Sequence, residues 1–244
     1  MKKLAIIGLG PRGLYALENL LFQLSLTYQH IEVLVFESSN LPGAGNVWNV
    51  NQPESNWINI TERALEGITT RPKIIINNIT INAFPSYHNW CNFSQSDTDP
   101  DAFPPRKKLG IYLNERFNSI EETLRHTNFF KIIKSNVIAL KLKKGSVKIE
   151  TTEGSWVCED VLLTVGHQPT ELSDQLKEWN KHVNKHNLLH LFNEPYPVSE
   201  LEDIKNEKNI TIGIRGFGLA MIDVMRFLVI NNYGNFKITN YDTF

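Results

Sequence analysis

Three glycines near the amino terminus are spaced as Gly8-x-Gly10-x-x-Gly13. The pyrophosphate of a dinucleotide needs backbone N–H donors and the positive end of a helix, with no side chain in between. Gly8 would permit a tight turn, Gly10 would let the backbone approach the phosphates, and Gly13 would let a helix press against a sheet. The spacing therefore predicts a phosphate cradle. The alternative is a glycine-rich turn that serves packing alone.

Glu37 stands 24 positions after Gly13, and a dinucleotide fingerprint places its acidic residue about 20 positions on. Its carboxylate would accept hydrogen bonds from the ribose hydroxyls of an adenosine, and Ser38 stands beside it. A carboxylate repels a 2′-phosphate, and no arginine follows in ESSNLPG, which disfavours NADP here. NAD and FAD share the ADP moiety, so both stay open on these residues.

A strand, a turn, a helix and a second strand would position these residues. Residues 3–10 form a short apolar run that ends in glycine, residues 11–26 repeat leucines on one helical face, and residues 31–38 form a second apolar run. Pro11 suits a first helical turn, which needs no N–H partner. The order predicts a βαβ unit of a parallel, Rossmann-like α/β fold.

Later segments extend this fold. Residues 106–126 carry apolar side chains at helical spacing. Three short strand-like pieces joined by the turns KKGS and TEGS predict an antiparallel meander, at residues 136–143, 146–152 and 155–159. Residues 160–169 predict another buried strand that runs into a glycine. Residues 41–105 are rich in Asn, Pro, Gly and aromatic residues, and their periodicity predicts no order of elements.

A second glycine pair, Gly216-x-Gly218, repeats the opening theme. Residues 210–215 predict a strand before it, and an apolar helix and a further strand should follow it. Met221 stands where a third glycine would complete the fingerprint, so helix-to-sheet packing would be looser here. The pair predicts a nicotinamide-nucleotide cradle that lacks one of the three glycines.

Four blocks make the chain resemble the bacterial FAD/NAD(P)-binding proteins related to flavin-dependent N-hydroxylating monooxygenases. The blocks are IIGLGPRGL, VFESSNLPGAGNVWNVNQPESNWINI, FPPRKKLGIYLNERF and VLLTVGHQP, in the order and approximate spacing of that family. The resemblance extends more weakly through IRGFGLAMIDVMRFL. It implies FAD as the cofactor and NAD(P)H as the hydride donor. In such proteins a nicotinamide-nucleotide domain interrupts the FAD domain.

On this resemblance the chain should have three parts. They are an FAD-binding domain over residues 1–170 with an irregular insertion at 41–105, a helix and connector over 171–208, and a partial second nucleotide-binding βαβ unit over 209–244.

The resemblance also implies further cofactor contacts. The loop Gly43-Ala44-Gly45 would approach the cofactor without side chains, and with Asn46 and Trp48 it would lie towards the flavin. Core packing is the alternative for Trp48. The TVGH segment matches the strand-end motif of two-dinucleotide flavoproteins. The predicted cofactor-binding residues are Gly8, Gly10, Pro11, Arg12, Gly13, Glu37, Ser38, Gly45, Asn46, Trp48, Arg106, Val137 through its backbone, Thr164, Gly166, Gly216 and Gly218.

Several charged residues leave alternatives open. Arg12 would lie beside the phosphates or in solvent, and Arg106 would hold an anion or pair with a surface acid. His167 has no partner in the sequence that would make it a base, so no catalytic residue is predicted. His182 and His186 stand four apart, as two zinc ligands could, but without a third ligand we expect a solvated face and no metal site.

The composition excludes some classes of partner. A formal net charge of −1 gives no field to attract nucleic acid or a membrane surface. No stretch approaches the roughly 20 apolar residues of a membrane span. The two cysteines are too few for a disulfide framework. We expect a cytoplasmic protein with two ordinary thiols, whose partners are its cofactors and a small-molecule substrate.

Three functions remain open on the sequence. The first is an FAD-dependent oxidoreductase of the monooxygenase type. The second is a nucleotide-binding module without turnover, or a fragment of a larger flavoprotein, which the short second βαβ unit motivates. The third is a plain NAD-dependent dehydrogenase, against which the meander and the Gly43 loop argue.

Overall fold

The computed structural model describes residues 1–27, 29–205, 207 and 209–230, and the chain divides into two compact units. The first unit comprises Met1–Val50 and Ile60–Gln168, and the second comprises Asn51–Asn59 and Pro169–Phe244. The chain therefore passes between the units at three points, after residues 50, 59 and 168.

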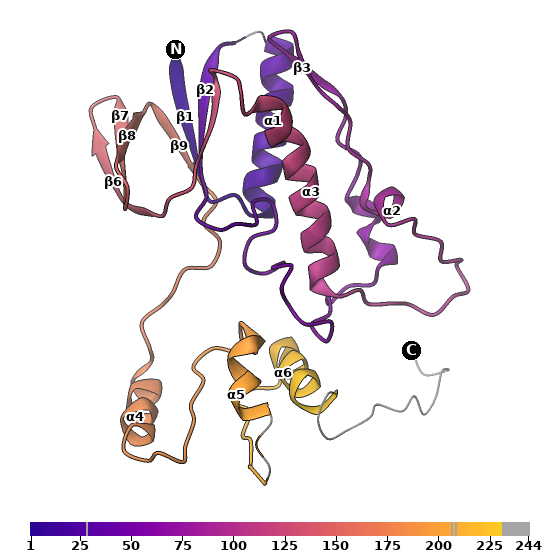
Figure 1. Cartoon of the computed structure of the whole chain (residues 1–244), viewed down its shortest axis with the longest axis vertical. Helices are drawn as coiled ribbons and strands as arrows, with labels where there is room; N and C mark the ends of the chain where they lie inside the picture. Colours follow the sequence, from indigo (N-terminus) through magenta and orange to yellow (C-terminus); the bar gives the residue numbers. More distant parts are fainter. Residues whose placement is uncertain (28, 206, 208, 231–244) are drawn as a thin grey trace. The chain divides into compact units, whose positions relative to one another are not determined.

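A parallel four-stranded sheet forms the centre of the first unit (Figure 1). The strands lie in the order β5-β2-β1-β9, and every adjacent pair is parallel. Their bounds are Lys2–Ile7 for β1, Ile31–Phe36 for β2, Phe130–Ile133 for β5 and Asp160–Leu163 for β9. This sheet confirms the predicted α/β fold class.

Two helices, α1 (Pro11–Thr27) and α3 (Arg106–Leu124), lie side by side against the sheet (Figure 1). The leucine stripe of α1 is buried, as its helical spacing predicts: Leu14, Leu17, Leu21 and Leu24. The predicted apolar stripe of α3 is buried in the same way: Leu109, Tyr112, Leu113, Phe117, Ile120 and Leu124. Both predicted helices are confirmed.

The antiparallel meander covers the other face of the sheet (Figure 1). Its strands are β6 (Val137–Lys143), β7 (Ser146–Thr151) and β8 (Ser155–Cys158). Ile149 and Cys158 are fully buried in one cluster with residues of the parallel sheet, and Trp156 meets Phe36 edge-on at 5.4 Å between ring centroids. The predicted meander is therefore confirmed, and its apolar face seals the core.

The insertion between β2 and α3 contains ordered elements that its composition does not predict. Strands β3 (Ile74–Ile76) and β4 (Ile79–Ile81) form a hairpin. Its two turn residues, Asn77 and Asn78, have φ values of 49° and 63°, a left-handed conformation that Asn tolerates better than most residues. The other elements are the 3₁₀ turn η1 (Arg63–Gly67) and the short helix α2 (Tyr87–Trp90).

The sequence predicts a buried strand at residues 160–169, but the strand β9 found there is partly exposed. Among the described strands it pairs with β1 alone, so it forms an edge of the sheet. Leu162 is 39% exposed and Leu163 is 55% exposed. Its apolar run predicts burial because central parallel strands have that pattern, but an edge strand has one neighbour fewer.

The second unit is helical in its described part. Its elements are α4 (Asp174–Val183), η2 (Val198–Leu201), α5 (Glu202–Lys205) and α6 (Leu219–Ile230). Six residues form its buried cluster: Val198, Leu201, Ile204, Val224, Phe227 and Leu228. In the described part of the chain, no helix has the length and hydropathy needed to cross a membrane.

The strand predicted at residues 210–215 is not formed. These residues carry no strand pairing, and Ile210, Ile212 and Ile214 are each about two fifths exposed, at 38%, 42% and 42%. A strand needs a neighbour to satisfy its backbone groups, and the described residues of this unit contain no other strand. The predicted final strand of the βαβ unit lies outside the described residues.

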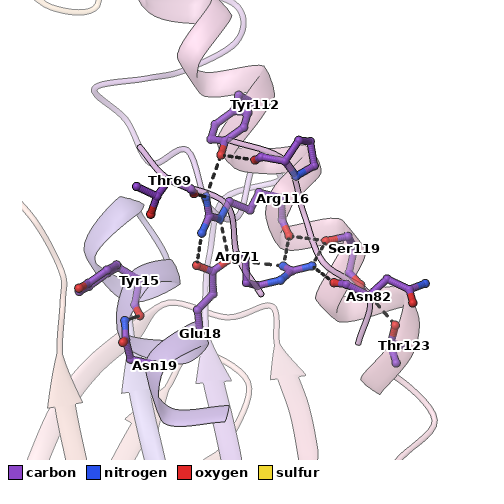
Figure 2. Close-up of polar contacts among 11 residues, drawn as sticks. Tyr15, Glu18, Asn19, Thr69, Arg71, Asn82, Tyr112, Arg116, Ser119 and Thr123 are labelled. Atoms are coloured by element: carbon purple, nitrogen blue, oxygen red, sulfur yellow. Dashed lines mark hydrogen bonds and ion pairs between the residues drawn. The ribbon is translucent and has the colours of Figure 1, made fainter. Parts of the chain in front are cut away.

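Three charged side chains are buried where the insertion meets the two helices: Glu18, Arg71 and Arg116 (Figure 2). Arg116 Nε and Nη2 donate to the two carboxylate oxygens of Glu18, at 2.8 Å each. Arg71 Nη1 lies 3.4 Å from Glu18 Oε1. The exposed fractions are 6% for Glu18, 2% for Arg71 and 9% for Arg116. The carboxylate of Glu18 therefore forms ion pairs with two buried guanidinium groups.

Neutral acceptors satisfy most of the other guanidinium N–H groups, at 2.7–3.0 Å (Figure 2). They are the carbonyls of Thr69, Asn82 and Arg116 and the hydroxyls of Tyr112 and Ser119. Burial lowers the pKa of Arg71, which the charge of Glu18 opposes. The cluster therefore joins α1, α3 and the insertion through charge-assisted hydrogen bonds.

Replacing Glu18 with Gln removes the charge that the two guanidiniums share and keeps the size of the side chain. Removing one partner of a buried ion pair costs about 3–5 kcal/mol, because the remaining charge is buried without compensation. We expect Glu18→Gln to lower the free energy of unfolding by about 3 kcal/mol or more, measured by urea denaturation.

The matched control is Glu122→Gln, which removes the same charge from an exposed position of α3. It should change the free energy of unfolding by no more than about 0.5 kcal/mol. Equal effects of the two substitutions would show that the buried cluster contributes nothing to stability.

Candidate dinucleotide site

Four residues directly follow the four parallel strands: Gly8, Glu37, Lys134 and Thr164. The carboxyl ends of parallel strands meet at one edge of a sheet, where open α/β sheets bind ligands. The backbone joins them there, since Gly8 N donates to the Phe36 carbonyl at 2.9 Å. The glycine turn and Glu37, predicted from different segments, therefore lie at the same edge.

Two of the three glycines have no room for a side chain. Gly8 has a φ of +88°, and a Cβ on it would lie 2.7 Å from the Thr164 carbonyl oxygen. A Cβ on Gly13 would lie 2.3 Å from the Gly8 carbonyl oxygen. At Gly10 a Cβ would meet Gly45 Cα alone, at an ordinary 3.7 Å. Gly8 and Gly13 thus let α1 pack on the turn, and Gly10 lies in ordinary contact distance of the loop at Gly45.

The first turn of α1 faces this edge. The helix begins at Pro11, and Leu14 N donates to the Gly10 carbonyl at 2.9 Å. The N–H groups before Leu14 have no acceptor within the helix and carry a partial positive charge. The Arg12 side chain is exposed in this turn and makes no ion pair with any described residue. This geometry suits an anion.

Thr164 supports the turn from the neighbouring strand. Its Oγ1 lies 2.5 Å from the Gly8 carbonyl oxygen and 3.2 Å from that of Ile7, and its N–H donates to Ile7 at 2.9 Å. Its hydroxyl is therefore directed at the backbone of the turn. Gly166, two residues on, has a φ of +71° and open space around it, and His167 is exposed.

The Glu37 carboxylate is held beside the glycine turn. Its Oε2 accepts from Leu9 N at 2.6 Å and its Oε1 accepts from Ser39 N at 2.7 Å. A carboxylate has about four acceptor positions, so Glu37 keeps the capacity to accept ribose hydroxyls. Ser38 is exposed next to it. The two backbone donors fix the direction of the carboxylate before a ligand arrives.

The loop of residues 42–48, which we call the cofactor loop, lies against the start of α1. Gly43 N donates to the Leu9 carbonyl at 2.6 Å. Gly45 has a φ of +65°, and a Cβ on it would lie 3.2 Å from Gly10 Cα. The cofactor loop therefore reaches the glycine turn, as its predicted role requires.

The cofactor loop also rests on α3 through close backbone contacts. A Cβ on Gly110 would lie 1.8 Å from the Trp48 carbonyl oxygen, and a Cβ on Gly43 would lie 2.4 Å from that of Leu113. Asn114 Nδ2 donates to the Pro42 carbonyl at 2.8 Å. Helix α3 is thus the base on which this loop is placed.

A cavity of about 130 Å³ opens beside Glu37. Its wall comes from the end of β2, from α3 and from β5: Glu37, Ser39, Asn40, Pro42, Asn114, Asn118, Glu121, Ile132 and Lys134. Ligand pockets usually measure about 300–1,000 Å³, so this cavity accommodates only part of a dinucleotide. Its place at Glu37 fits the nucleoside end.

The other predicted site residues lie at varied positions. Asn46 is exposed and Trp48 is half-buried in the cofactor loop. Arg106 is half-buried at the first position of α3. Val137 packs against the core cluster under the meander, and its backbone pairs with Thr151. Gly216 and Gly218 belong to the second unit, where both are exposed. Their contacts with a nucleotide stay predictions.

Sequence reasoning missed Gly110, Asn114 and Lys134. Gly110 stands inside a helical pattern, where a glycine costs about 1 kcal/mol relative to alanine. That cost was the available signal of a close backbone approach. Asn114 and Lys134 carry no such signal, because their place at the cavity depends on the tertiary fold.

The two cysteines lie outside this site and are free thiols. Burial raises the pKa of Cys158 to about 11, and it also raises the pKa of Cys91. Both thiols are therefore protonated near neutral pH. No group of three or more potential metal ligands occurs among the described residues.

The parallel sheet, the glycine turn at a helix start and the covering meander define a Rossmann-like dinucleotide-binding protein. Residues 5–168 match the FAD-NAD(P)-binding family model, which covers the whole of this site. The chain belongs to that family. This match confirms the resemblance drawn from the four sequence blocks. It also confirms the prediction that the cofactor is FAD.

The chain is similar to several larger proteins. The nitrosuccinic acid synthase of Aspergillus oryzae is 25% identical over 241 residues, which cover 96% of this chain and 36% of the synthase. Tmm from a Pelagibacter species is 20% identical, with a TM-score of 0.47 over 70% of this chain and 38% of that one. A flavin-containing monooxygenase from Stenotrophomonas maltophilia is 15% identical, with a TM-score of 0.38 over 70% and 42%. This chain spans about two fifths of their lengths.

The substitution Gly110→Ala tests whether the close contact between the cofactor loop and α3 is needed for FAD binding. The new methyl group would displace the Trp48 carbonyl, and overpacking of this kind costs about 1–3 kcal/mol. We expect the Kd for FAD to rise about tenfold, measured by flavin fluorescence titration. The control is Gly67→Ala, where no atom lies within 4 Å of the added carbon. The same Kd in both variants would contradict the role of Gly110.

Glu37→Gln tests the ribose contact. An amide offers one oxygen, so its NH₂ group would face the N–H of Leu9 or Ser39 and the side chain would turn away. We expect FAD affinity to fall by about 1–3 kcal/mol, the cost of an unsatisfied buried polar group, in the same titration. The exposed Glu153→Gln in the meander should leave the affinity unchanged. Unaltered binding by Glu37→Gln would remove Glu37 from the site.

Proposed function

We propose that this chain is the FAD-binding part of an oxidoreductase of the flavin-dependent N-hydroxylating type, with a nicotinamide nucleotide as hydride donor. The observation that carries the proposal is the agreement between the family match and the geometry of the first unit. Residues 5–168 contain the glycine turn, Glu37 and the cofactor loop at one edge of the sheet.

Each part of the site has a task in this proposal. The first turn of α1 and Gly10 receive the pyrophosphate, and Glu37 accepts hydrogen bonds from the ribose hydroxyls. The cofactor loop, with Asn46 and Trp48, borders the flavin and limits its exposure to water. When bound, FAD supplies the redox chemistry by accepting a hydride and activating oxygen.

The name of one relative supports a class of substrate. The Aspergillus synthase is named for a nitro compound, and oxygenation of a nitrogen is the chemistry of N-hydroxylating enzymes. We infer a small molecule with an amino nitrogen as the substrate of the full activity. The free thiols and the dependence on NAD(P)H suit the reducing cytoplasm.

A second candidate function has an observation in its favour. Residues 211–217 are exposed and carry no strand pairing, so the described residues contain no sheet behind Gly216 and Gly218. A module that holds FAD without turnover would need only the first unit. The two candidates differ in whether the bound flavin is reduced.

Reconstitution with FAD followed by addition of NADH or NADPH without oxygen separates them. We expect the purified chain to retain FAD after gel filtration and the flavin absorbance near 450 nm, a property of oxidised flavin in general, to bleach on reduction, at roughly the 1–1,000 s⁻¹ usual for enzymes. Admission of oxygen should restore the absorbance.

The outcomes are distinct. Retained FAD without bleaching by either nucleotide would support the binding module and reject the oxidoreductase. A chain that retains no FAD before or after soaking would reject both. The variant Glu37→Gln serves as the control, because weakened flavin retention there links the absorbance to this site.

A further inference from the structure

A segment inserted in the sequence of the first unit belongs to the second. Residues 51–59 follow the cofactor loop after only Asn49 and Val50, and the chain returns to the first unit at Ile60. Two of the three crossings between the units thus flank this segment. The cofactor loop is therefore connected by a short covalent link to the second unit.

The segment has its own internal order. Asn56 N donates to the Pro53 carbonyl at 3.1 Å, and Asn56 Nδ2 donates to Gln52 Oε1 at 3.2 Å. Asn56 is 1% exposed. These two bonds join Gln52, Pro53 and Asn56 to one another, directly before Trp57.

Trp57 attaches this segment to α6 of the second unit. The Arg226 guanidinium carbon lies 3.2 Å from the centroid of the Trp57 ring, well within the roughly 6 Å of a cation–π contact. Arg226 is half-buried, and this burial lowers the pKa of its guanidinium.

Arg226 lies on the helix that follows the second glycine pair. Helix α6 begins at Leu219, directly after Gly218, and Met221 N donates to the Gly218 carbonyl at 3.1 Å. A ligand phosphate at Gly216 and Gly218 would fix the start of this helix. Arg226 on the same helix would then be fixed as well.

We propose that the stack of Arg226 on Trp57 couples nucleotide binding at the second glycine pair to FAD binding at the cofactor loop. The proposal rests on the proposed function and on the predicted nicotinamide-nucleotide cradle at Gly216 and Gly218. The path runs from α6 through Arg226 and Trp57 into residues 51–59, and from there to Trp48 and its contact with Gly110 on α3.

The proposed coupling is positive, and it acts equally in both directions. A ligand that fixes α6 would also restrict residues 51–59 through the Trp57 stack, so less of their conformational freedom would be left for FAD binding to remove. Binding of one nucleotide therefore strengthens binding of the other. Coupling between sites is commonly about 5–150-fold and is equal in both directions by linkage.

The test measures the Kd for FAD with and without saturating NADP⁺, by isothermal titration of the full chain. In the unaltered protein we expect NADP⁺ to tighten FAD binding about fivefold or more, and FAD to tighten NADP⁺ binding by the same factor. In Trp57→Ala and Arg226→Gln both nucleotides should still bind, but the ratio of the Kd for FAD without NADP⁺ to the Kd with NADP⁺ should be near one. Arg226→Lys keeps the cation and should retain part of the ratio.

A matched control is Trp179→Ala. Trp179 and Trp57 are both 38% exposed, and Trp179 also stacks with an arginine of the second unit, Arg215, at 5.4 Å. It lies outside residues 51–59, so its loss should leave the ratio unchanged. Thermal denaturation of each variant checks that it is folded.

The failure of this proposal and that of the proposed function give different results. Independent binding of FAD and NADP⁺ by the unaltered chain, or an unchanged ratio in folded Trp57→Ala, would overturn the coupling and leave the two sites intact. An unaltered chain that binds neither nucleotide would overturn both proposals.

Discussion

Backbone segments in this protein approach so closely that four positions exclude even a methyl group. The close pairs are Gly8 with Thr164, Gly13 with Gly8, Gly43 with Leu113, and Gly110 with Trp48. Each pair joins two elements that border the site: strand end to turn, helix to turn, loop to helix. The placement of the phosphate-binding turn and the cofactor loop thus depends on glycine at these four positions. Even the Cβ of an alanine would clash with the neighbouring backbone or side chain.

Helix α3 connects this constraint to the charge buried beneath it. One part of the helix seats the cofactor loop through Gly110 and Asn114, and Arg116 on the same helix binds Glu18 of α1. Buried ion pairs add little net stability over an apolar packing, but here two hydrogen bonds of 2.8 Å join the Arg116 guanidinium to both carboxylate oxygens of Glu18. The cluster therefore fixes α3 relative to α1, the two elements between which the cofactor loop is held.

Local patterns in the sequence account for the first unit in large part. The leucine stripe of α1, the helical spacing of α3 and the turns of the meander each report a period or a turn that neighbouring residues determine. Residues such as Gly110 and Lys134 acquire their roles from contacts with distant segments, which no local pattern records. The edge position of β9 and the buried Arg71 have the same origin, since both depend on what the rest of the chain places beside them.

The two glycine motifs illustrate why the same pattern has different outcomes. Gly8 follows β1, which has paired neighbours on both sides, so two hydrogen bonds hold the turn in place: Gly8 N donates to the Phe36 carbonyl, and Thr164 Oγ1 donates to the Gly8 carbonyl. Gly216 also has a positive φ, 105°, but residues 211–217 before and around it pair with no strand in the described chain. A glycine supplies conformational freedom, and the neighbouring strands decide whether that freedom becomes one defined turn. For this reason the contact of Trp57 with α6 is important to the second unit: it gives the helix after Gly218 an anchor that the missing strand pairing does not provide.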